Sequence, residues 1–286
     1  MIKVLKYFTQ AIFIYVFFLL GKLIGLNLSR KIFSFVFRNI GPLIKSSESV
    51  KNNLLKFSKD ISDTEIKLIK SQMWSNYGKT FIEYIFLNKF KDDNLHIKIK
   101  GENILNEIKQ SGKPVIFVSG HFANFELMSM EISKKKLKLA TIYRPLNNYF
   151  LNPFMEYLRK KFVCKNQIKK GLSGVKDAIE YIQNNHSIAL MIDQRVTEGE
   201  KLKFFNEIAF TTTLPAQLSL KYNLPIFPIY IERKENDFFE MEIYEPIDSS
   251  KYKDKNEISK KLNEILEGMI KRNPGQWIWT HKRWKL

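Results

Sequence analysis

The sequence is poor in the side chains that build metal sites and covalent crosslinks. It holds one cysteine, Cys164, and four histidines, which are His96, His121, His186 and His281. A single cysteine excludes an intramolecular disulfide and any site built from several cysteines, and the histidines lack zinc-ligand spacing. We therefore expect no metal. A reducing, cytosol-facing location is the natural inference from so little cysteine.

Loops that bind nucleotides and turns that carry a nucleophile are also missing. There is no Walker or dinucleotide loop, because the short stretch 171–174 is not preceded by a strand pattern. Neither Ser119 nor Cys164 lies in a Gly-x-Ser-x-Gly turn, so a serine-triad esterase is disfavoured. No organic cofactor is implied. Without internal repeats or a long flexible linker, the chain is expected to fold as one catalytic domain after its N-terminal segment.

Acidic residues are scarce relative to basic ones. The chain has 47 Lys and Arg against 29 Asp and Glu, a net charge of +18. Such an excess favours an anionic partner, which could be nucleic acid, an anionic membrane leaflet, or a phosphate-rich substrate or acidic carrier protein. Lysine runs such as 134–136 can equally be solvated surface. Because no nucleic-acid-binding motif is present, we expect a membrane surface and no nucleic acid.

The longest apolar run lies at the N-terminus. Residues 11–20 are uninterrupted, and the apolar character extends to about residues 7 and 26. Twenty helical residues span ~30 Å, the thickness of the hydrocarbon core. We interpret residues 1–30 as an uncleaved membrane anchor. A signal peptide and a buried core helix are the alternatives, and the sequence does not decide between spanning the bilayer and lying in its interface.

The remainder, residues 31–286, is predicted to be an α/β domain of three layers. Residues 31–90 have helical periodicity, broken at Gly41-Pro42, and form a helical platform. From about residue 95 to 286, β-rich runs alternate with helical patterns, which indicates a central sheet of mostly parallel or mixed strands. The predicted strands cover residues 97–99, 115–119, 139–143, 188–192, 226–231 and 238–243.

A histidine follows the second of these runs. The apolar segment 114–119 leads into His121, and Glu126 comes five positions later. Five positions are ~140° out of phase on a helix, so His121 should lie in the turn and Glu126 in the first helical turns. Near neutral pH, an imidazole can take a proton from a hydroxyl while a carboxylate holds its tautomer. We predict that His121 is the general base and that Glu126 orients it, although this spacing also arises by chance.

Other candidate residues also follow predicted strands. Arg144 comes after 139–143, and Asp193 and Arg195 come after 188–192, so three strand ends should converge on one site. The two arginines suit phosphate or carboxylate, although either could instead pair with Asp193. Arg159, on a helical pattern, is a further candidate for an anionic headgroup. We predict that these four residues bind substrate.

Together the motifs resemble a known enzyme family. Their order and spacing are similar to those of the late acyltransferases of lipid A biosynthesis, the lauroyl and myristoyl transferases of Gram-negative bacteria. The chain departs from the family pattern at Asn206 and Leu214, where glycines are expected. The motifs are His121 with Glu126, then Tyr143-Arg144-Pro145, Asp193-Gln194-Arg195, Phe204-Phe205, residues 211–213 with Pro215-Ala216, and the tryptophan-rich block 274–284.

The resemblance implies an acyltransferase fold and direct acyl transfer to a hydroxyl without an acyl-enzyme. Acyl carrier protein or acyl-CoA would be the donor, and a lipid A precursor the acceptor. The enzyme would lie at the bacterial inner membrane with its catalytic domain facing the cytoplasm. The departures leave chain length and acceptor detail open.

Two other readings remain. An acyltransferase for glycerolipids or phosphoinositide mannosides would share the motifs up to Tyr143 and differ in the later blocks. A non-enzymatic basic membrane protein would need neither His121 nor Glu126 at a strand end. Trp277, Trp279 and Trp284 are expected to pack in the core or to lie at the lipid interface, with His281 beside them.

Overall fold

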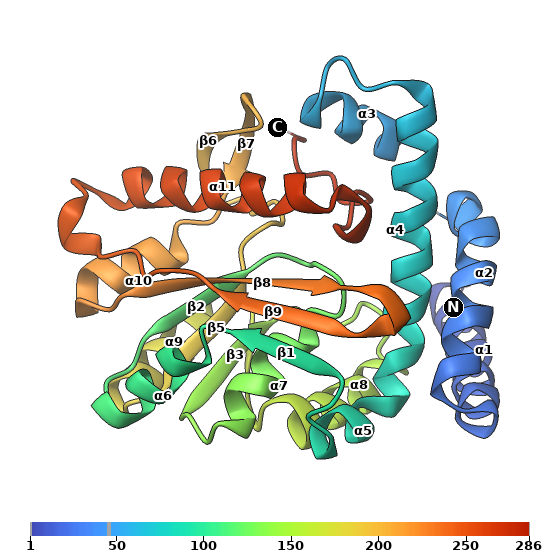
Figure 1. Cartoon of the computed structure of the whole chain (residues 1–286), viewed down its shortest axis with the longest axis horizontal. Helices are drawn as coiled ribbons and strands as arrows, with labels where there is room; N and C mark the ends of the chain where they lie inside the picture. The colour runs from blue at the N-terminus through green and yellow to red at the C-terminus, as the bar shows by residue number, and fades with distance from the viewer. Residues whose placement is uncertain (1, 45–46, 286) are drawn as a thin grey trace.

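A seven-stranded mixed sheet forms the centre of the molecule (Figure 1). The computed structural model describes residues 2–44 and 47–285. The sheet order is β1-β9-β8-β2-β5-β3-β4, and only the β8–β9 pairing in it is antiparallel. The strands are β1 (Ile97–Lys100), β2 (Ile116–Ser119), β3 (Leu139–Tyr143), β4 (Asn166–Lys169), β5 (Ser187–Met191), β8 (Ile226–Arg233) and β9 (Phe239–Ile243).

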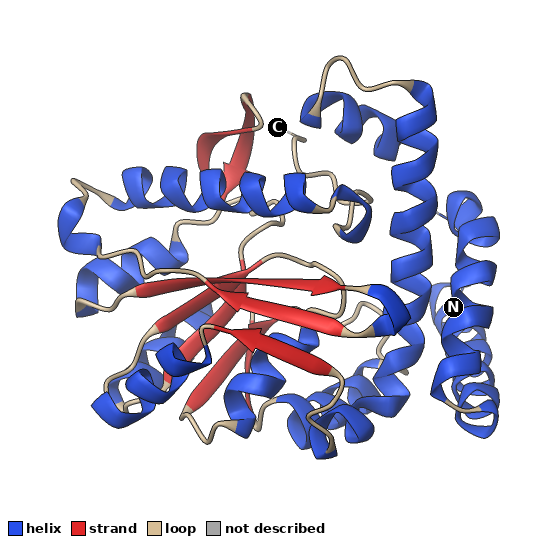
Figure 2. Ribbon diagram, viewed as in Figure 1, coloured by secondary structure: helices blue, strands red, loops and turns tan. Residues whose placement is uncertain are grey.

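Helices cover both faces of this sheet (Figure 2). Side chains along β2 alternate between the two faces. Ile116 and Val118 pack in the core beneath α9, α10 and α11. Phe117 packs in the core on the other face, beneath α6, α7 and α8. These helices are α6 (Glu102–Ser111), α7 (Glu126–Lys134), α8 (Asn152–Leu158), α9 (Leu172–Gln183), α10 (Leu214–Tyr222) and α11 (Lys255–Arg272). The three-layer α/β prediction is therefore confirmed.

The six predicted strands are present within two residues at each end, but three strands were not predicted. One of them is β4, a mostly polar strand in which Ile168 is the buried residue. The other two, β6 (Glu200–Phe204) and β7 (Glu207–Thr211), form an antiparallel hairpin outside the main sheet. Phe205 and Asn206 turn this hairpin with φ of 52° and 62°. A two-residue turn with both φ positive favours glycine or asparagine, which accounts for Asn206 where a glycine was expected.

The helical platform precedes the sheet and lies along one side of it (Figure 1). It comprises α2 (Leu26–Ile44), α3 (Ser47–Phe57), α4 (Asp63–Glu83) and α5 (Leu87–Asp92), and the N-terminal helix α1 (Ile2–Ile24) packs against α2. α4 begins with a capping box in which Ser62 and Glu65 satisfy each other's backbone N–H groups. Short helical turns η1 (Tyr84–Phe86), η2 (Arg159–Val163), η3 (Glu235–Asp237), η4 (Ser249–Lys251) and η5 (Pro274–Gln276) complete the chain.

Two expected helix boundaries in the N-terminal part of the chain are wrong. The predicted break at Gly41-Pro42 does not occur, because α2 continues through Pro42 to Ile44. Gly41 serves close packing instead, since a Cβ there would lie 2.3 Å from the Trp74 ring of α4. The N-terminal helix ends at Ile24 rather than near residue 30, and Gly25 follows with φ of 82°, a conformation that glycine adopts without strain.

Candidate active site

His121 lies in the turn between β2 and α7, as predicted, and Glu126 is the first residue of α7. The turn is packed tightly against its surroundings. A Cβ at Gly120 would lie 2.8 Å from the Phe122 ring and 3.0 Å from Leu266 of α11. Only glycine therefore fits between the strand end and the histidine.

The backbone after His121 is clamped by the platform and by the C-terminal segment. Ala123 has a φ of 43°, which is unfavourable for a residue with a Cβ. Its carbonyl accepts a hydrogen bond from Thr80 Oγ1 at 2.9 Å, and its N–H donates to the carbonyl of Gln276 at 3.1 Å. These contacts offset the strain and hold the backbone of the turn that carries His121.

The carboxylate that orients His121 is Asp193, which follows the neighbouring strand β5. His121 Nδ1 lies 2.7 Å from Asp193 Oδ1, and the His121 backbone N–H donates to Oδ2 at 2.9 Å. Trp277 Nε1 also donates to Oδ2, at 2.8 Å. Asp193 is completely buried, and although burial disfavours its charge, His121 holds its pKa well below the ordinary value. Asp193 is thus a carboxylate that fixes the ring.

Glu126 does not form this contact, which corrects the expected pairing. Its Oε1 accepts hydrogen bonds from Tyr84 Oη and from Arg159 Nε, the latter at 2.8 Å. Burial raises the pKa of Tyr84, and Glu126 adds to the effect, so the phenol stays protonated and donates. Sequence spacing could not reveal this arrangement, because the start of α7 turns the Glu126 side chain toward η1 and η2 instead of toward the imidazole.

Arg159 forms an ion pair with Glu126 and also lies at the wall of the cavity, where it is a candidate for substrate contact. It is 8% exposed and pairs with Glu126, which outweighs burial and raises its pKa. Its Nη1 is buried with no hydrogen-bond partner among the described residues, although Arg159 belongs to the cavity wall. Buried donors are normally hydrogen-bonded, and Nη1 is an exception beside the cavity.

The other two predicted arginines lie in different places. Arg144 is exposed at the rim of the cavity beyond β3, and Lys170 is at the same rim beyond the adjacent strand β4. Burial and the neighbouring Arg144 charge lower the pKa of Lys170. Arg195 is not part of the wall, and its Nε donates to the carbonyl of Lys285 at 2.6 Å. Neither Arg144 nor Arg195 pairs with Asp193.

These side chains surround a cavity of about 630 Å³ at the carboxyl ends of β2, β5, β3 and β4. Its wall combines the polar groups around His121 with apolar side chains. Gln10, Ile14 and Phe18 bring one face of α1 into the wall, so the apolar N-terminal helix closes part of the site. Within residues 2–44 and 47–285, no group of His, Cys, Asp or Glu side chains could hold a metal ion.

The C-terminal block completes the wall of the cavity, and within it Trp277 contacts Asp193 and His281 lies beside His121. Trp277, Trp279 and Trp284 are buried core residues, so the lipid-interface alternative for them is wrong. Trp277 also fixes Asp193, a role that its tryptophan-rich context did not indicate. Gln194 and His281 lie beside His121, with Gln194 Nε2 3.2 Å from His121 Nε2 and 3.0 Å from His281 Nε2.

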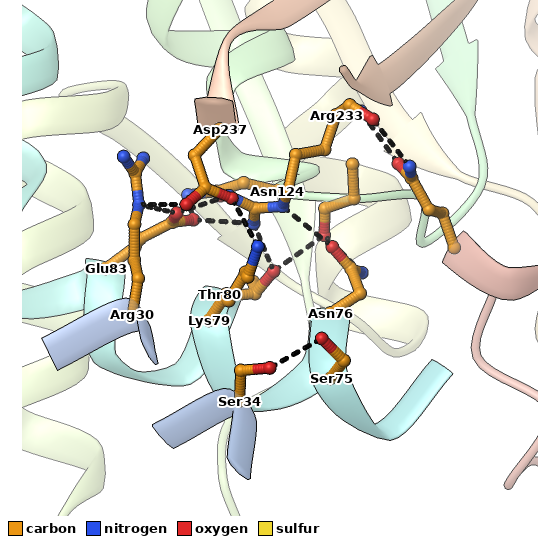
Figure 3. Close-up of polar contacts among 12 residues, drawn as sticks. Arg30, Ser34, Ser75, Asn76, Lys79, Thr80, Glu83, Asn124, Arg233 and Asp237 are labelled. Carbon is orange, nitrogen blue, oxygen red and sulfur yellow. Dashed lines mark hydrogen bonds and ion pairs between the residues drawn. The ribbon is translucent and has the colours of Figure 1, made fainter. Parts of the chain in front are cut away.

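A buried ionic network supports the turn from the platform side (Figure 3). Glu83 of α4 accepts from Arg30 of α2 at 2.7 Å and from Arg233 of β8. Asn124, three residues after His121, donates to Glu83 at 2.9 Å. Burial disfavours the Glu83 charge, but the two guanidinium groups overcome this and lower its pKa. The network thereby connects the outer helix α2 to the histidine turn.

Comparison with known proteins identifies the family of the chain. The model of the family "Bacterial lipid A biosynthesis acyltransferase" matches residues 1–286 of the chain. The chain belongs to this family. It is therefore an acyltransferase of lipid A biosynthesis, and the resemblance inferred from the motifs is confirmed.

Individual relatives of this acyltransferase are distant. Lipid A biosynthesis acyltransferase 2 of Shigella flexneri is 23% identical, over 97% of this chain and 91% of its own length. Lipid A biosynthesis palmitoleoyltransferase of Escherichia coli K12 is 23% identical, over 85% of this chain and 80% of its own. The 1-acyl-sn-glycerophosphate acyltransferase PlsC of Thermotoga maritima aligns with 89% of this chain and all of its own, at 15% identity and a TM-score of 0.43.

Proposed function

We propose that this acyltransferase moves a fatty acyl chain from an acyl thioester to a hydroxyl of a lipid A precursor, with His121 as general base. The observation that carries the proposal is the His121–Asp193 pair at the wall of the cavity. With Nδ1 bound to the carboxylate, Nε2 keeps its lone pair and can accept a proton. A buried carboxylate that stays ionised stabilises the imidazolium formed in the reaction.

The reaction is a single displacement. His121 Nε2 takes the hydroxyl proton as the oxygen attacks the thioester carbonyl, and the tetrahedral intermediate then expels the thiolate, which receives the proton from the imidazolium. No enzyme nucleophile is needed. Ser119 Oγ is buried and donates to the carbonyl of Ile229 at 2.7 Å, and Cys164 is 4% exposed. Neither side chain is presented to a substrate.

In this mechanism Glu126 acts through Arg159 instead of through His121. The ion pair holds the guanidinium at the cavity wall, and a guanidinium can donate to a phosphate or a carbonyl oxygen. Arg144 and Lys170 give the rim two more positive charges. We assign this rim to a phosphate of the acceptor, because adjacent cations suit a doubly charged group better than a neutral sugar.

The N-terminal helix bears on membrane attachment. Within the described ranges, α1 is the one helix long and apolar enough to cross a bilayer, a test that a buried helix or signal sequence also passes. It is held along the domain, since Asn148 donates to Tyr7 O, Tyr15 donates to Phe150 O and Lys22 donates to Ile85 O. These contacts cover ~22 Å of helix at ~1.5 Å per residue. We propose that α1 embeds in the interface, with its bare face in lipid.

This placement suits the proposed substrates. The lipid acceptor would enter from the bilayer surface beside α1, whose Ile14 and Phe18 line the cavity. The donor would be an acyl carrier protein or acyl-CoA, both of which are anionic and would be attracted by a net charge of +18. Because such thioesters are cytoplasmic, we place the catalytic domain on the cytoplasmic side of the inner membrane.

Acyl transfer in vitro tests the proposal. Membranes containing the protein are supplied with acyl-acyl carrier protein or acyl-CoA and with a Kdo-bearing lipid A precursor, and the product is detected by mass. We expect a gain of one acyl chain on the precursor. A parallel reaction offers lysophosphatidic acid as acceptor. Acylation of that lipid alone would contradict the lipid A assignment and favour the glycerolipid alternative.

A further inference from the structure

Gln194 connects two imidazoles at the centre of the site. Its carboxamide nitrogen lies 3.2 Å from His121 Nε2 and 3.0 Å from His281 Nε2, and the two rings are 5.7 Å apart. Gln194 follows Asp193 directly, and Gln194, His121 and His281 all belong to the cavity wall. The residue next to the orienting carboxylate therefore touches the nitrogen that performs proton transfer.

The direction of these hydrogen bonds follows from Asp193. An ionised carboxylate only accepts, so His121 Nδ1 carries the proton and Nε2 is the acceptor. The group facing Nε2 must then be a donor, which is the NH2 of Gln194. That NH2 has two hydrogens, one for each imidazole. His281 Nε2 is accordingly an acceptor and holds the carboxamide in place.

The acyl transfer needs a donor for the oxyanion that forms on the thioester carbonyl, and backbone N–H groups usually supply it. Here the N–H groups of three successive residues in the histidine turn are occupied. His121 N donates to Asp193 at 2.9 Å, Phe122 N to Gly120 O at 2.8 Å and Ala123 N to Gln276 O at 3.1 Å. The Gln194 carboxamide is a side-chain donor already adjacent to Nε2.

We propose that Gln194 is the oxyanion donor of this acyltransferase and that His281 is the residue that positions it. The inference rests on the proposed function. The substrate hydroxyl displaces the Gln194 N–H from His121 Nε2, gives its proton to Nε2 and bonds to the thioester carbon. The freed N–H donates to the resulting C–O⁻. When the carbonyl re-forms and the C–S bond breaks, the thiolate takes the proton from Nε2.

Kinetics of substituted enzymes test the donor role. Gln194→Ala should lower kcat by about 10²–10³ with KM for donor and acceptor nearly unchanged, because the interaction forms only in the transition state. Gln194→Glu keeps the shape but has no N–H to donate, so it should not restore kcat. Gln217→Ala, an exposed glutamine of α10, is the matched control and should retain full activity.

The positioning role of His281 has a separate test. His281→Ala should lower kcat by about tenfold, an order-of-magnitude expectation for a lost orienting hydrogen bond. His281→Asn supplies a carbonyl acceptor and should recover part of that loss. Thermal unfolding of each variant, measured beside wild type, verifies folding. No recovery with Asn in a folded protein would overturn the role of His281.

A measurement without turnover separates this inference from the proposed function. The protein has only four histidines, so ¹⁵N-labelled imidazoles can be resolved by NMR in detergent. We expect Nδ1–H and an unprotonated, hydrogen-bonded Nε2 at His121, with both Nε2 resonances shifting in Gln194→Ala. Unshifted resonances, or kcat within threefold of wild type in Gln194→Ala, would overturn the inference. Wild-type protein without acyl transfer would instead overturn the proposed function.

Discussion

At the level of single residues, the proposed chemistry depends on one imidazole, His121, which Asp193 holds in place. A positioned general base contributes ~10²–10⁴-fold in typical enzymes. His121→Ala should therefore lose most turnover, and Asp193→Asn should lose a similar factor because the ring is no longer held in the reactive tautomer. Initial rates of acyl transfer measure both. Ser119→Ala, which changes a buried hydroxyl on the same strand, should keep substantial activity. If His121→Ala keeps more than half of wild-type activity, His121 is not the general base.

Cys164 supplies the complementary test of the direct mechanism. Its thiol donates to the carbonyl of Leu139 at 3.3 Å, and burial raises its pKa, so little thiolate exists near neutral pH. Cys164→Ser should retain substantial activity. The native protein should react with a thiol reagent far more slowly than the unfolded protein. Intact mass after incubation with the acyl donor should show no adduct, and an acylated Cys164 would contradict the single displacement.

At the scale of elements, the Glu83 network joins α2, α4 and β8 to the histidine turn (Figure 3). Removing one charge from a buried pair costs about 3–5 kcal/mol. Glu83→Gln should destabilise the fold by roughly that amount at pH 7, as measured by denaturant unfolding. Glu240→Gln, which breaks the more exposed pair with Lys100, is the matched control and should cost about 0–1 kcal/mol.

Wild type and Glu83→Gln should also differ in how their stability depends on pH. The folded state lowers the pKa of Glu83 below its ordinary value of 4.5, so the unfolded state binds the proton more readily. The stabilisation is complete above that value and is lost as pH falls through the folded pKa. The difference in Tm between wild type and Glu83→Gln should be constant from about pH 8 to 6 and shrink in acid below the ordinary pKa. A difference that grew in acid would contradict this linkage.

In the whole molecule, α1 and α2 lie on one side of the sheet, and α9 lies on the opposite side (Figure 1). Phe13 and Leu20 of α1 are 59% and 50% exposed and should lie in lipid. Burial in lipid of the exposed apolar side chains of residues 11–20 should stabilise membrane association by on the order of 10 kcal/mol. Full-length protein should therefore resist salt and carbonate washing. Charges at both positions, Phe13→Glu with Leu20→Glu, should make the protein extractable by salt, because the attachment left is electrostatic and is screened.

Leu172→Glu provides the control, since Leu172 is 90% exposed at the start of α9. This variant should remain membrane-bound through both washes. Sedimentation and immunoblotting of the washed membranes measure the bound fraction. If wild-type protein is released by salt alone, α1 is a helix of the protein core and the attachment depends on charge.

Features that depend on local pattern could be predicted from the amino-acid sequence. Alternating apolar runs gave the α/β class, and the run before His121 located it in a turn at a strand end. The motif order was enough to place the chain in its family, because each motif is a short contiguous segment. The break predicted at Gly41-Pro42 was wrong, because Pro42 lies inside α2 and Gly41 allows the close approach of Trp74, a contact that local pattern does not reveal.

The carboxylate that contacts the histidine could be identified only in the folded molecule. Glu126 is five positions from His121 and Asp193 is 72 positions away, yet the parallel pairing of β2 with β5 brings Asp193 to Nδ1. The C-terminal segment then adds Trp277 to that carboxylate. Hydrogen bonds across neighbouring strands depend on strand order and register, and these are set by the packing of the whole core. Local spacing therefore predicted the position of His121 correctly and its carboxylate partner wrongly, and its role as general base stays a prediction.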